Sequence, residues 1–281
     1  MKIKVIMTGG TVGSEEKNGV ISNDKNRDVA GLWKEKSHSD IEFSKAYPYS
    51  ILSENICIEN WEMLLQELNK DITGYSGIII THGSDTLSYT SAMISIFCRD
   101  FKIPVVLTGA NKVLSHPDSN GIPNFEKAVD IVRENKTGVW TVFDGIYPAN
   151  CIMEANCFTD KFSLGECSGK YPEFNFDIKF KNKVMIIKEY PFADYSAVDL
   201  ANDVKAVLLV GYHSGTANEN SVRVLAQKCR DKGISLYLQG GSSKSGIYSS
   251  TYNLKKSGVI PLYDMTAEYA FAFLMFEINK S

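Results

Sequence analysis

A dense group of polar side chains follows an uninterrupted apolar run near residue 80. The run is Gly77-Ile78-Ile79-Ile80, and five of the six residues Thr81 to Thr86 carry a hydroxyl, imidazole or carboxylate, the other being a glycine. A hydroxyl becomes a nucleophile when a nearby base takes its proton, and a carboxylate can accept that proton. The competing reading is that the last three of these residues only cap a helix, because such side chains accept hydrogen bonds from its first N–H groups.

A second loop of the same kind lies at the start of the chain. Lys2 to Met7 has the pattern of a short strand, and Thr8-Gly9-Gly10-Thr11-Val12-Gly13-Ser14 follows it without a linker. The glycines let the backbone approach a ligand closely, and two threonine hydroxyls are presented beside them. A phosphate cradle is the competing function, but the loop has neither the G-x-x-x-x-G-K-[ST] nor the G-x-G-x-x-G pattern. Two loops of one composition favour a binding site over simple helix capping.

Buried parallel strands are expected to carry both loops. The run from Gly77 to Ile80 is too short for a helix and rich in β-branched residues, which is typical of a strand buried on both faces. A helix is predicted after the loop, because apolar and small residues recur there at three- and four-residue spacing: Leu87, Thr90, Ser91, Met93, Ile94 and Phe97. A polar loop between such a strand and its helix lies at the carboxyl edge of the sheet, where open α/β folds bind ligands.

The rest of the chain alternates predicted strands and helices. Strands are expected near 49–52, 105–107, 139–143, 184–187, 206–210 and 235–238, and helices near 58–65, 125–132, 225–232 and 267–278. Residues 13–35 are polar and glycine-containing and predict a mobile loop, and residues 168–182 predict a domain connection. We therefore predict a two-domain α/β fold. Residues 1–178 form a large, mostly parallel sheet flanked by helices, and residues 183–281 form a smaller α/β domain.

Composition argues against several classes of partner. The formal net charge of −3 gives no basic footprint for nucleic acid or anionic membranes. No apolar run approaches the roughly 20 residues of a membrane span, and the first residues have the pattern of a core strand, not of a signal peptide. We therefore expect a cytoplasmic protein with a small-molecule partner, no nucleic acid and no membrane.

The cysteines and histidines show no metal-site spacing. Six cysteines, at 57, 98, 151, 157, 167 and 229, include no C-x-x-C pair, so we expect reduced thiols and neither a disulfide framework nor a zinc site. The four histidines and the carboxylates are not spaced as metal ligands, so no metal and no cofactor are expected. His116 is expected to be an exposed loop residue and not a catalytic base.

The two loops together resemble the signature motifs of the bacterial-type L-asparaginase family. The family motifs read T-G-G-T-I and T-H-G-T-D-T, and this chain has Thr8-Gly9-Gly10-Thr11-Val12 and Thr81-His82-Gly83-Ser84-Asp85-Thr86. Val12 replaces an isoleucine and Ser84 a threonine. Further similarity in segments 103–110, 120–124, 257–260 and 264–266 extends the resemblance over nearly the whole chain, and the last of these segments is similar to the cytoplasmic type I branch.

The resemblance implies roles for particular residues. It implies an amidohydrolase in which Thr11 is the nucleophile, Asp85 binds the substrate amino group and Ser53 binds its α-carboxylate. Backbone N–H groups of the loops at Gly10 and Gly83 would hold the oxyanion.

Two catalytic positions depart from the family pattern. Glu154 stands where the family has a catalytic lysine, and Val20 stands where the family lid has a tyrosine. In the family, the trio matching Ser84, Glu154 and Asp85 works like a Ser-His-Asp triad. A glutamate can also take a proton, provided that burial and the neighbouring Asp85 carboxylate raise its pKa.

The expected activity is hydrolysis of the side-chain amide of an asparagine- or glutamine-like substrate. Two alternatives stay open. A non-catalytic ligand-binding homologue would keep the pocket without the proton-transfer groups. An amidase acting on a larger amide, such as a peptide or a biosynthetic intermediate, would use Glu54 and Glu154 to accommodate a cationic or bulkier group. If the lysine segment aligns differently, Lys161 is the next candidate for the base.

The resemblance also implies a homodimer or homotetramer. In the family, loops of the second domain reach into the active site of a neighbouring subunit. The matching loops here are Gly211 to Thr216 and Gly240 to Tyr252, and we expect His213 or Tyr248 to complete the site.

Overall fold

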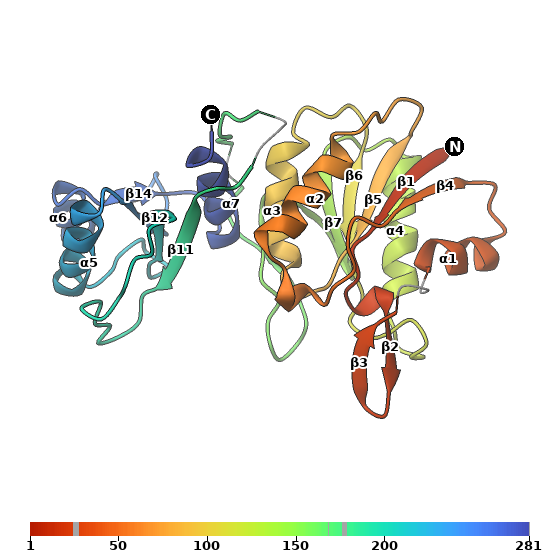
Figure 1. Cartoon of the computed structure of the whole chain (residues 1–281), viewed down its shortest axis with the longest axis horizontal. Coiled ribbons are helices and arrows are strands. Elements are labelled where there is room, and N and C mark those ends of the chain that lie inside the picture. The colour runs from red at the N-terminus through yellow and green to blue at the C-terminus, as the bar shows by residue number, and fades with distance from the viewer. Residues whose placement is uncertain (25–27, 168, 176–178, 281) are drawn as a thin grey trace. The chain divides into compact units, whose positions relative to one another are not determined.

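The computed structural model describes residues 1–24, 28–167, 169–175 and 179–280 (Figure 1). Its contacts divide the chain into two compact units, Met1–Leu164 and Gly165–Ser281. Both units are of α/β type, which confirms the predicted fold class. The predicted domain limits at residues 178 and 183 lie later than the boundary between these units and stay a prediction, and residue 178 lies outside the described residues.

The first unit is built around a six-stranded sheet with the order β4-β1-β5-β6-β7-β8. The strands are β1 (Lys2–Met7), β4 (Glu42–Ala46), β5 (Gly77–Thr81), β6 (Val105–Thr108), β7 (Val139–Phe143) and β8 (Gly145–Pro148). Neighbouring strands run parallel except β7 and β8. Strand β5 is buried along its whole length, as its uninterrupted apolar run predicts.

Helices cover both faces of this sheet. Helices α1 (Val29–Ser37) and α4 (Gly121–Arg133) lie on one face, and α2 (Ile58–Leu68) and α3 (Leu87–Phe97) lie on the other (Figure 1). Trp33, Phe43 and Phe125 pack together under α1 and α4, with ring centroids 5.8 to 6.2 Å apart. Helix α3 is almost wholly buried. The polar loop before α3 is therefore held between a buried strand and a buried helix.

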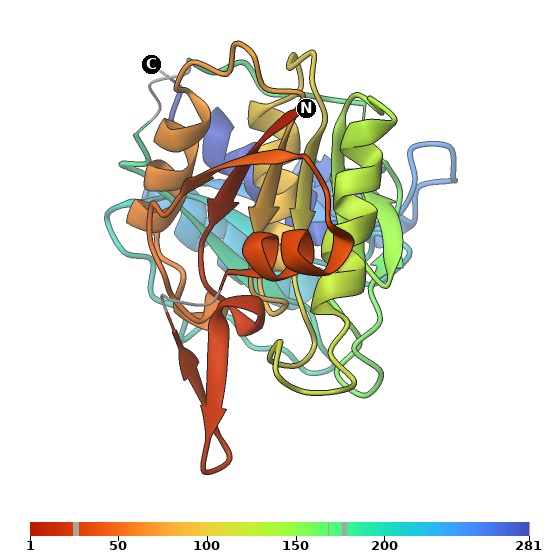
Figure 2. The same cartoon turned by 90° about the vertical axis from the view of Figure 1, so that its right-hand side faces the viewer.

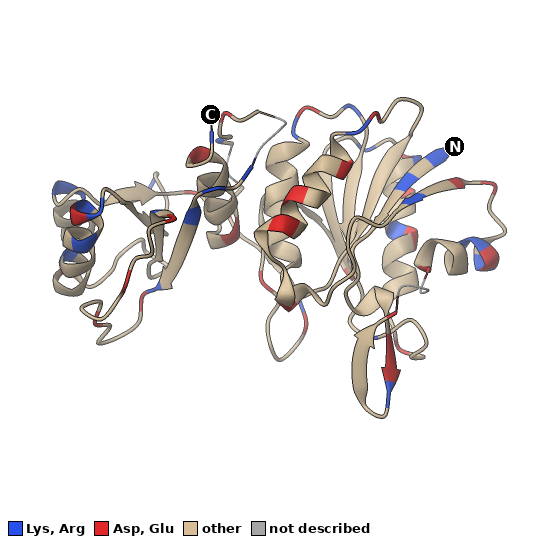
Figure 3. Cartoon of the chain, viewed as in Figure 1, with Lys and Arg blue, Asp and Glu red and all other residues tan. Residues whose placement is uncertain are grey.

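Residues 14–23 form a hairpin and not the predicted loop. Strands β2 (Ser14–Lys17) and β3 (Val20–Asn23) pair antiparallel and project beyond the carboxyl edge of the sheet (Figure 2), and β2 is acidic (Figure 3). Asn18 and Gly19 form the turn with φ values of 53° and 76°. Positive φ at both positions is what a two-residue hairpin turn requires, and Asn-Gly is its preferred sequence. The loop prediction is also wrong from Val29 onward, where helix α1 begins, and residues 25–27 of the predicted loop lie outside the described residues.

The strand predicted from residue 49 is wrong as well. The edge strand is β4, and Ile51 makes a single bridge to Gly9. The N–H of Ile51 donates to the carbonyl of Thr8 at 3.1 Å, and its carbonyl accepts from the N–H of Gly10 at 2.8 Å. Gly9 has φ 98°, so the chain leaves extended geometry after β1 and the pairing ends there. This bridge draws the following 3₁₀ turn, η2 (Ser53–Asn55), toward the first glycine loop.

The second unit is a smaller parallel α/β unit. Its four strands are β11 (Lys183–Lys188), β12 (Val204–Val210), β13 (Ser235–Gln239) and β14 (Ile260–Leu262), all parallel and in that order. Its helices are α5 (Glu219–Asp231), α6 (Ser249–Lys256) and α7 (Ala267–Glu277). Residues of β12, β13, α5 and α6 supply most of its main apolar core.

The cysteines only partly follow the prediction. Cys57, Cys98, Cys157 and Cys229 are free thiols, whereas Cys151 and Cys167 are disulfide-bonded. The expectation of six reduced thiols is therefore wrong for two of them. Among the described residues we find no helix whose length and hydropathy would suit a membrane crossing.

Candidate active site

The two glycine loops touch at the carboxyl edge of β1 and β5. A Cβ placed on Gly10 would lie 2.3 Å from both N and Cα of Gly83, so Gly10 can only be glycine with this backbone. The φ of 70° at Gly10 requires glycine for a second reason. The contact places Thr11, which follows Gly10 and begins the 3₁₀ turn η1 (Thr11–Gly13), beside the loop that carries Ser84.

A third segment joins this contact through Ser53. A Cβ placed on Gly83 would lie 2.4 Å from Oγ of Ser53. Ser53 is 4% exposed, and its Oγ is buried without a hydrogen-bond partner in the described part of the chain. Buried hydroxyls normally have partners, so an orphaned one beside two glycine loops indicates a place where a ligand can bind.

Helix capping does not account for the hydroxyl-rich loop. Thr86 is the N-cap of α3, but its side chain makes no cap hydrogen bond. Its Oγ1 instead donates to the carbonyl of Ser53 at 3.0 Å. This bond ties the second loop to η2, so the capping reading is wrong for Thr86 and the segments that contain Ser53 and Ser84 are held together.

Three carboxylates gather around the second loop. Burial raises the pKa of the Asp85 carboxyl, and repulsion from Glu54 and Asp160 raises it further. Asp160 is held in a tight turn in which the N–H of Asn156 donates to the carbonyl of Lys161 at 2.9 Å, and the N–H of Asp160 donates to the carbonyl of Asn156 at 2.9 Å. Sequence alone does not single out Asp160, because only the fold brings its turn to Asp85.

Glu154 has different surroundings from those its predicted role requires. It is exposed, directly after the short strand β9 (Ile152–Met153), which pairs with β10 (Ser163–Leu164). The charges that raise the Asp85 pKa are those of Glu54 and Asp160, and Glu154 is not among them. The burial expected for a proton-accepting Glu154 is therefore absent. Val20, at the lid-tyrosine position, is 65% exposed on the hairpin.

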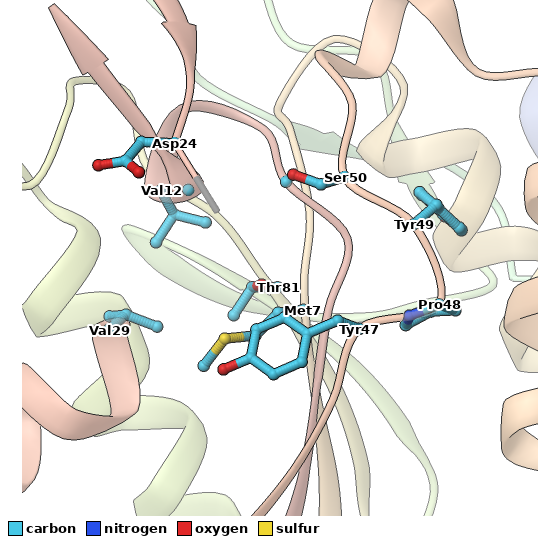
Figure 4. A pocket seen from close by; sticks show the side chains of 11 residues that line it. Met7, Val12, Asp24, Val29, Tyr47, Pro48, Tyr49, Ser50 and Thr81 are labelled. Carbon is cyan, nitrogen blue, oxygen red and sulfur yellow. The ribbon is translucent and has the colours of Figure 1, made fainter. Parts of the chain in front are cut away.

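A separate cavity lies on the side of the first loop that faces α1. Its volume is about 340 Å³, and its lining comprises Met7, Gly9, Val12, Gly13, Asp24, Val29, Tyr47, Pro48, Tyr49, Ser50 and Thr81. Figure 4 shows Met7, Tyr47, Thr81 and Val29 around this cavity. Neither Thr11 nor Ser53 lines it. The prediction that Thr11, Ser53, Ser84 and Asp85 share one pocket stays a prediction.

The two loops predicted to reach a partner subunit, Gly211 to Thr216 and Gly240 to Tyr252, contact each other through glycines. A Cβ on Gly215 would lie 2.5 Å from the carbonyl oxygen of Gly240, so these two loops of the second unit touch. Tyr248 is 58% exposed at the start of α6. Their part in a shared site stays a prediction.

The described residues contain no group of three or more His, Cys, Asp or Glu side chains suited to a metal ion.

The fold and the loop contact together define an asparaginase-like amidohydrolase. Residues 2–163 match the asparaginase N-terminal domain, and the chain belongs to the asparaginase family. The resemblance found in the two sequence motifs is thereby confirmed.

Two kinds of relative share almost the whole chain. The L-asparaginase of Thermococcus kodakarensis is 27% identical over 100% of this chain and 94% of its own length. A glutamyl-tRNA(Gln) amidotransferase subunit of Methanococcus vannielii is 28% identical over 97% of this chain and 73% of its own length.

Solved structures show the same fold. The thermostable L-asparaginase of Thermococcus kodakarensis has a TM-score of 0.79 at 24% identity, covering 100% of this chain and 94% of the other. L-asparaginase I of Vibrio cholerae has a TM-score of 0.79 at 21% identity, covering 99% of this chain and 92% of the other.

Proposed function

We propose that the chain hydrolyses the side-chain amide of an asparagine- or glutamine-like substrate, with Thr11 as the nucleophile. The observation that carries this proposal is the backbone contact of Gly10 with Gly83, because it brings the loop that carries Thr11 against the loop that carries Ser84 and Asp85. The orphaned Oγ of Ser53 at the same contact supports a substrate carboxylate there.

The reaction would proceed in two halves. The Thr11 hydroxyl attacks the amide carbon while its proton passes to a base, and N–H groups of the glycine loops stabilise the oxyanion. The C–N bond then breaks and ammonia leaves with that proton. Water hydrolyses the resulting ester and regenerates the hydroxyl. The family pattern assigns the proton acceptor to Glu154, acting with Ser84 and Asp85, although Glu154 is exposed and is not among the charges that raise the pKa of Asp85. Lys161 is the next candidate.

A second candidate function is hydrolysis of a larger or cationic amide. Glu54 and Asp160 beside Asp85 concentrate negative charge where a small amino acid would bring a single ammonium group. The relatives named as glutamyl-tRNA(Gln) amidotransferase subunits also point to a substrate or role beyond free asparagine. A non-catalytic binding homologue is the third candidate, since Glu154 and Val20 replace two family catalytic residues.

Ammonia release from asparagine, glutamine and a panel of substituted amides, some with an added amine, separates these functions. We expect turnover by the wild type, and Glu154→Gln abolishes it if Glu154 is the base. The cationic amides would be preferred if the carboxylates of Glu54 and Asp160 contribute. No turnover of any amide, together with ligand binding that survives Thr11→Ala, would identify a binding protein. Full activity of Glu154→Gln would shift the base to Lys161.

A further inference from the structure

A buried hydrogen-bond chain lies behind the second loop. Its central residue is His82, which is 1% exposed. Its ring Nδ1 lies 2.8 Å from the carbonyl oxygen of Gly83, and its Nε2 lies 3.0 Å from Oγ1 of Thr90. The indole N–H of Trp61 donates to the same Thr90 hydroxyl at 3.1 Å. These hydrogen bonds therefore link α2 and α3 to the loop that carries Ser84.

The chemistry of the bonded groups fixes which atom donates in each of these hydrogen bonds. A carbonyl oxygen only accepts, so the imidazole proton of His82 is assigned to Nδ1. Nε2 is then a lone-pair acceptor, and the Thr90 hydroxyl donates to it while accepting from Trp61. Burial lowers the pKa of His82 to about 4, although the bond to Gly83 favours the charged form. The ring is therefore neutral near pH 7, and Nδ1 donates and Nε2 accepts at that pH.

The bond to the Gly83 carbonyl also orients the next N–H group. In a trans peptide the carbonyl and the following N–H point to opposite sides, and the described residues contain no cis peptide. With the Gly83 carbonyl held toward the buried ring, the N–H of Ser84 points away from the core. Within the described residues this N–H has no hydrogen-bond acceptor.

We infer that His82 is a positioning residue, which holds the Gly83–Ser84 peptide so that the Ser84 N–H faces the substrate as an oxyanion donor. The inference rests on the proposed function, because an oxyanion forms only if an amide is attacked. Donors fixed before the reaction stabilise the transition state without reorganisation. The contact of Gly83 with Gly10 places this N–H at the same loop junction as Thr11.

Two substitutions of His82 separate positioning from core filling. An asparagine amide matches the position of imidazole Nδ1, whereas a glutamine amide matches Nε2. His82→Asn therefore keeps the donor to Gly83, and His82→Gln keeps only the partner of Thr90. We expect His82→Gln to lower kcat about 10- to 100-fold with KM changed less than about threefold, and His82→Asn to retain kcat within about fivefold. Equal kcat for the two variants would overturn the inference.

A matched pair of threonine variants controls for lost stability. Thr90→Val removes the hydroxyl that orders the ring, and Thr141→Val removes a comparable buried hydroxyl, which donates to Oγ of Ser91 at 2.8 Å. Both should lose similar stability, but only Thr90→Val should lower kcat, by about tenfold. Equal kcat losses would show that the effect is general core damage and would contradict positioning.

A spectroscopic test needs no substrate. Nitrogen NMR of the imidazole should show the Nδ1–H tautomer at pH 7, and the Nε2–H tautomer would overturn the inference. If the wild type hydrolyses no amide, the proposed function fails, and the Ser84 amide signal still decides the positioning. We expect that signal to be shared by wild type and His82→Asn and shifted in His82→Gln. An identical Ser84 amide signal in all three proteins would refute the positioning role of His82.

Discussion

Single residues explain how the site is assembled. Gly10 and Gly83 lack the Cβ that would force their loops apart, and Ser53 brings a buried hydroxyl without a partner to the same point. His82 lies behind them with both ring nitrogens bonded, so its neutral form is part of the folded structure. A buried neutral histidine must be protonated when the chain unfolds in acid, which couples the stability of the loop to pH.

We predict a loss of stability in acid that depends on His82. Its pKa is about 4 in the folded chain, against about 6.5 for an exposed histidine. The contribution of the neutral ring is fully present above pH 6.5 and is lost as the pH falls from 6.5 toward 4, because only the unfolded chain binds the proton in that window. The full loss is roughly 3 kcal/mol.

Urea unfolding of the wild type and His82→Asn at pH 7 and pH 4.5 measures this loss. Carboxylates titrate alike in both proteins, so the asparagine variant provides the baseline. The wild type should lose about 2 kcal/mol more free energy of unfolding between the two pH values than the variant does. Equal losses would mean that the ring is not buried in its neutral form.

At the scale of elements, strand β1 must be held firmly because the first glycine loop continues directly from it. Lys4 of β1 is 5% exposed, and its Nζ lies 2.8 Å from Oε1 of Glu67 and donates to the Glu67 carbonyl at 2.9 Å. Burial opposes the charge on Glu67, but its bonds to Lys4 and Lys70 leave its pKa lowered. This buried pair connects β1 to the end of α2.

We predict that Lys4→Met lowers the free energy of unfolding by about 3 kcal/mol, because Glu67 loses a buried partner. Lys2→Met is the matched control on the same strand. Lys2 pairs with Glu42 at 3.1 Å, but both side chains are exposed, so the loss should be much smaller than that of Lys4→Met. Urea unfolding at pH 7 measures both, and equal small losses would contradict a stabilising role for the buried pair.

Apolar periodicity was sufficient to predict the elements of the core. The uninterrupted run of β5 and the spacing in α3 identify a buried strand and helix, and both are present. The hairpin and β4 show no such pattern because most of their residues are exposed or only half-buried. Only the Asn18-Gly19 pair signals the hairpin, through its need for positive φ.

The candidate site was predictable only where the motif itself supplies the residue. The contact of Gly10 with Gly83 follows from two glycine loops on adjacent parallel strands. The proximity of Asp160 to Asp85 depends on a turn more than seventy positions along the chain, and no local pattern encodes it. The bonds of His82 depend on Trp61 and Thr90, which come from two different helices.

At the scale of the whole molecule, we predict that a second copy of the chain completes the active site. The resemblance to the family and the exposed loops of the second unit, including Tyr248, motivate this prediction. Sedimentation equilibrium should show a homodimer or homotetramer, and Tyr248→Ala should lower kcat/KM without changing the assembly. A monomer that retains full ligand binding would contradict a shared site.

The identity of the nucleophile is tested most directly by two changes at Thr11. Thr11→Ser keeps a hydroxyl and should retain measurable ammonia release, whereas Thr11→Ala removes it and should lower kcat by about a thousandfold or more. Mass spectrometry of wild-type protein quenched during turnover should show a substrate acyl group on the peptide that contains Thr11. Undiminished ammonia release by Thr11→Ala, or an acyl group on the peptide of Ser84 instead, would contradict the assignment.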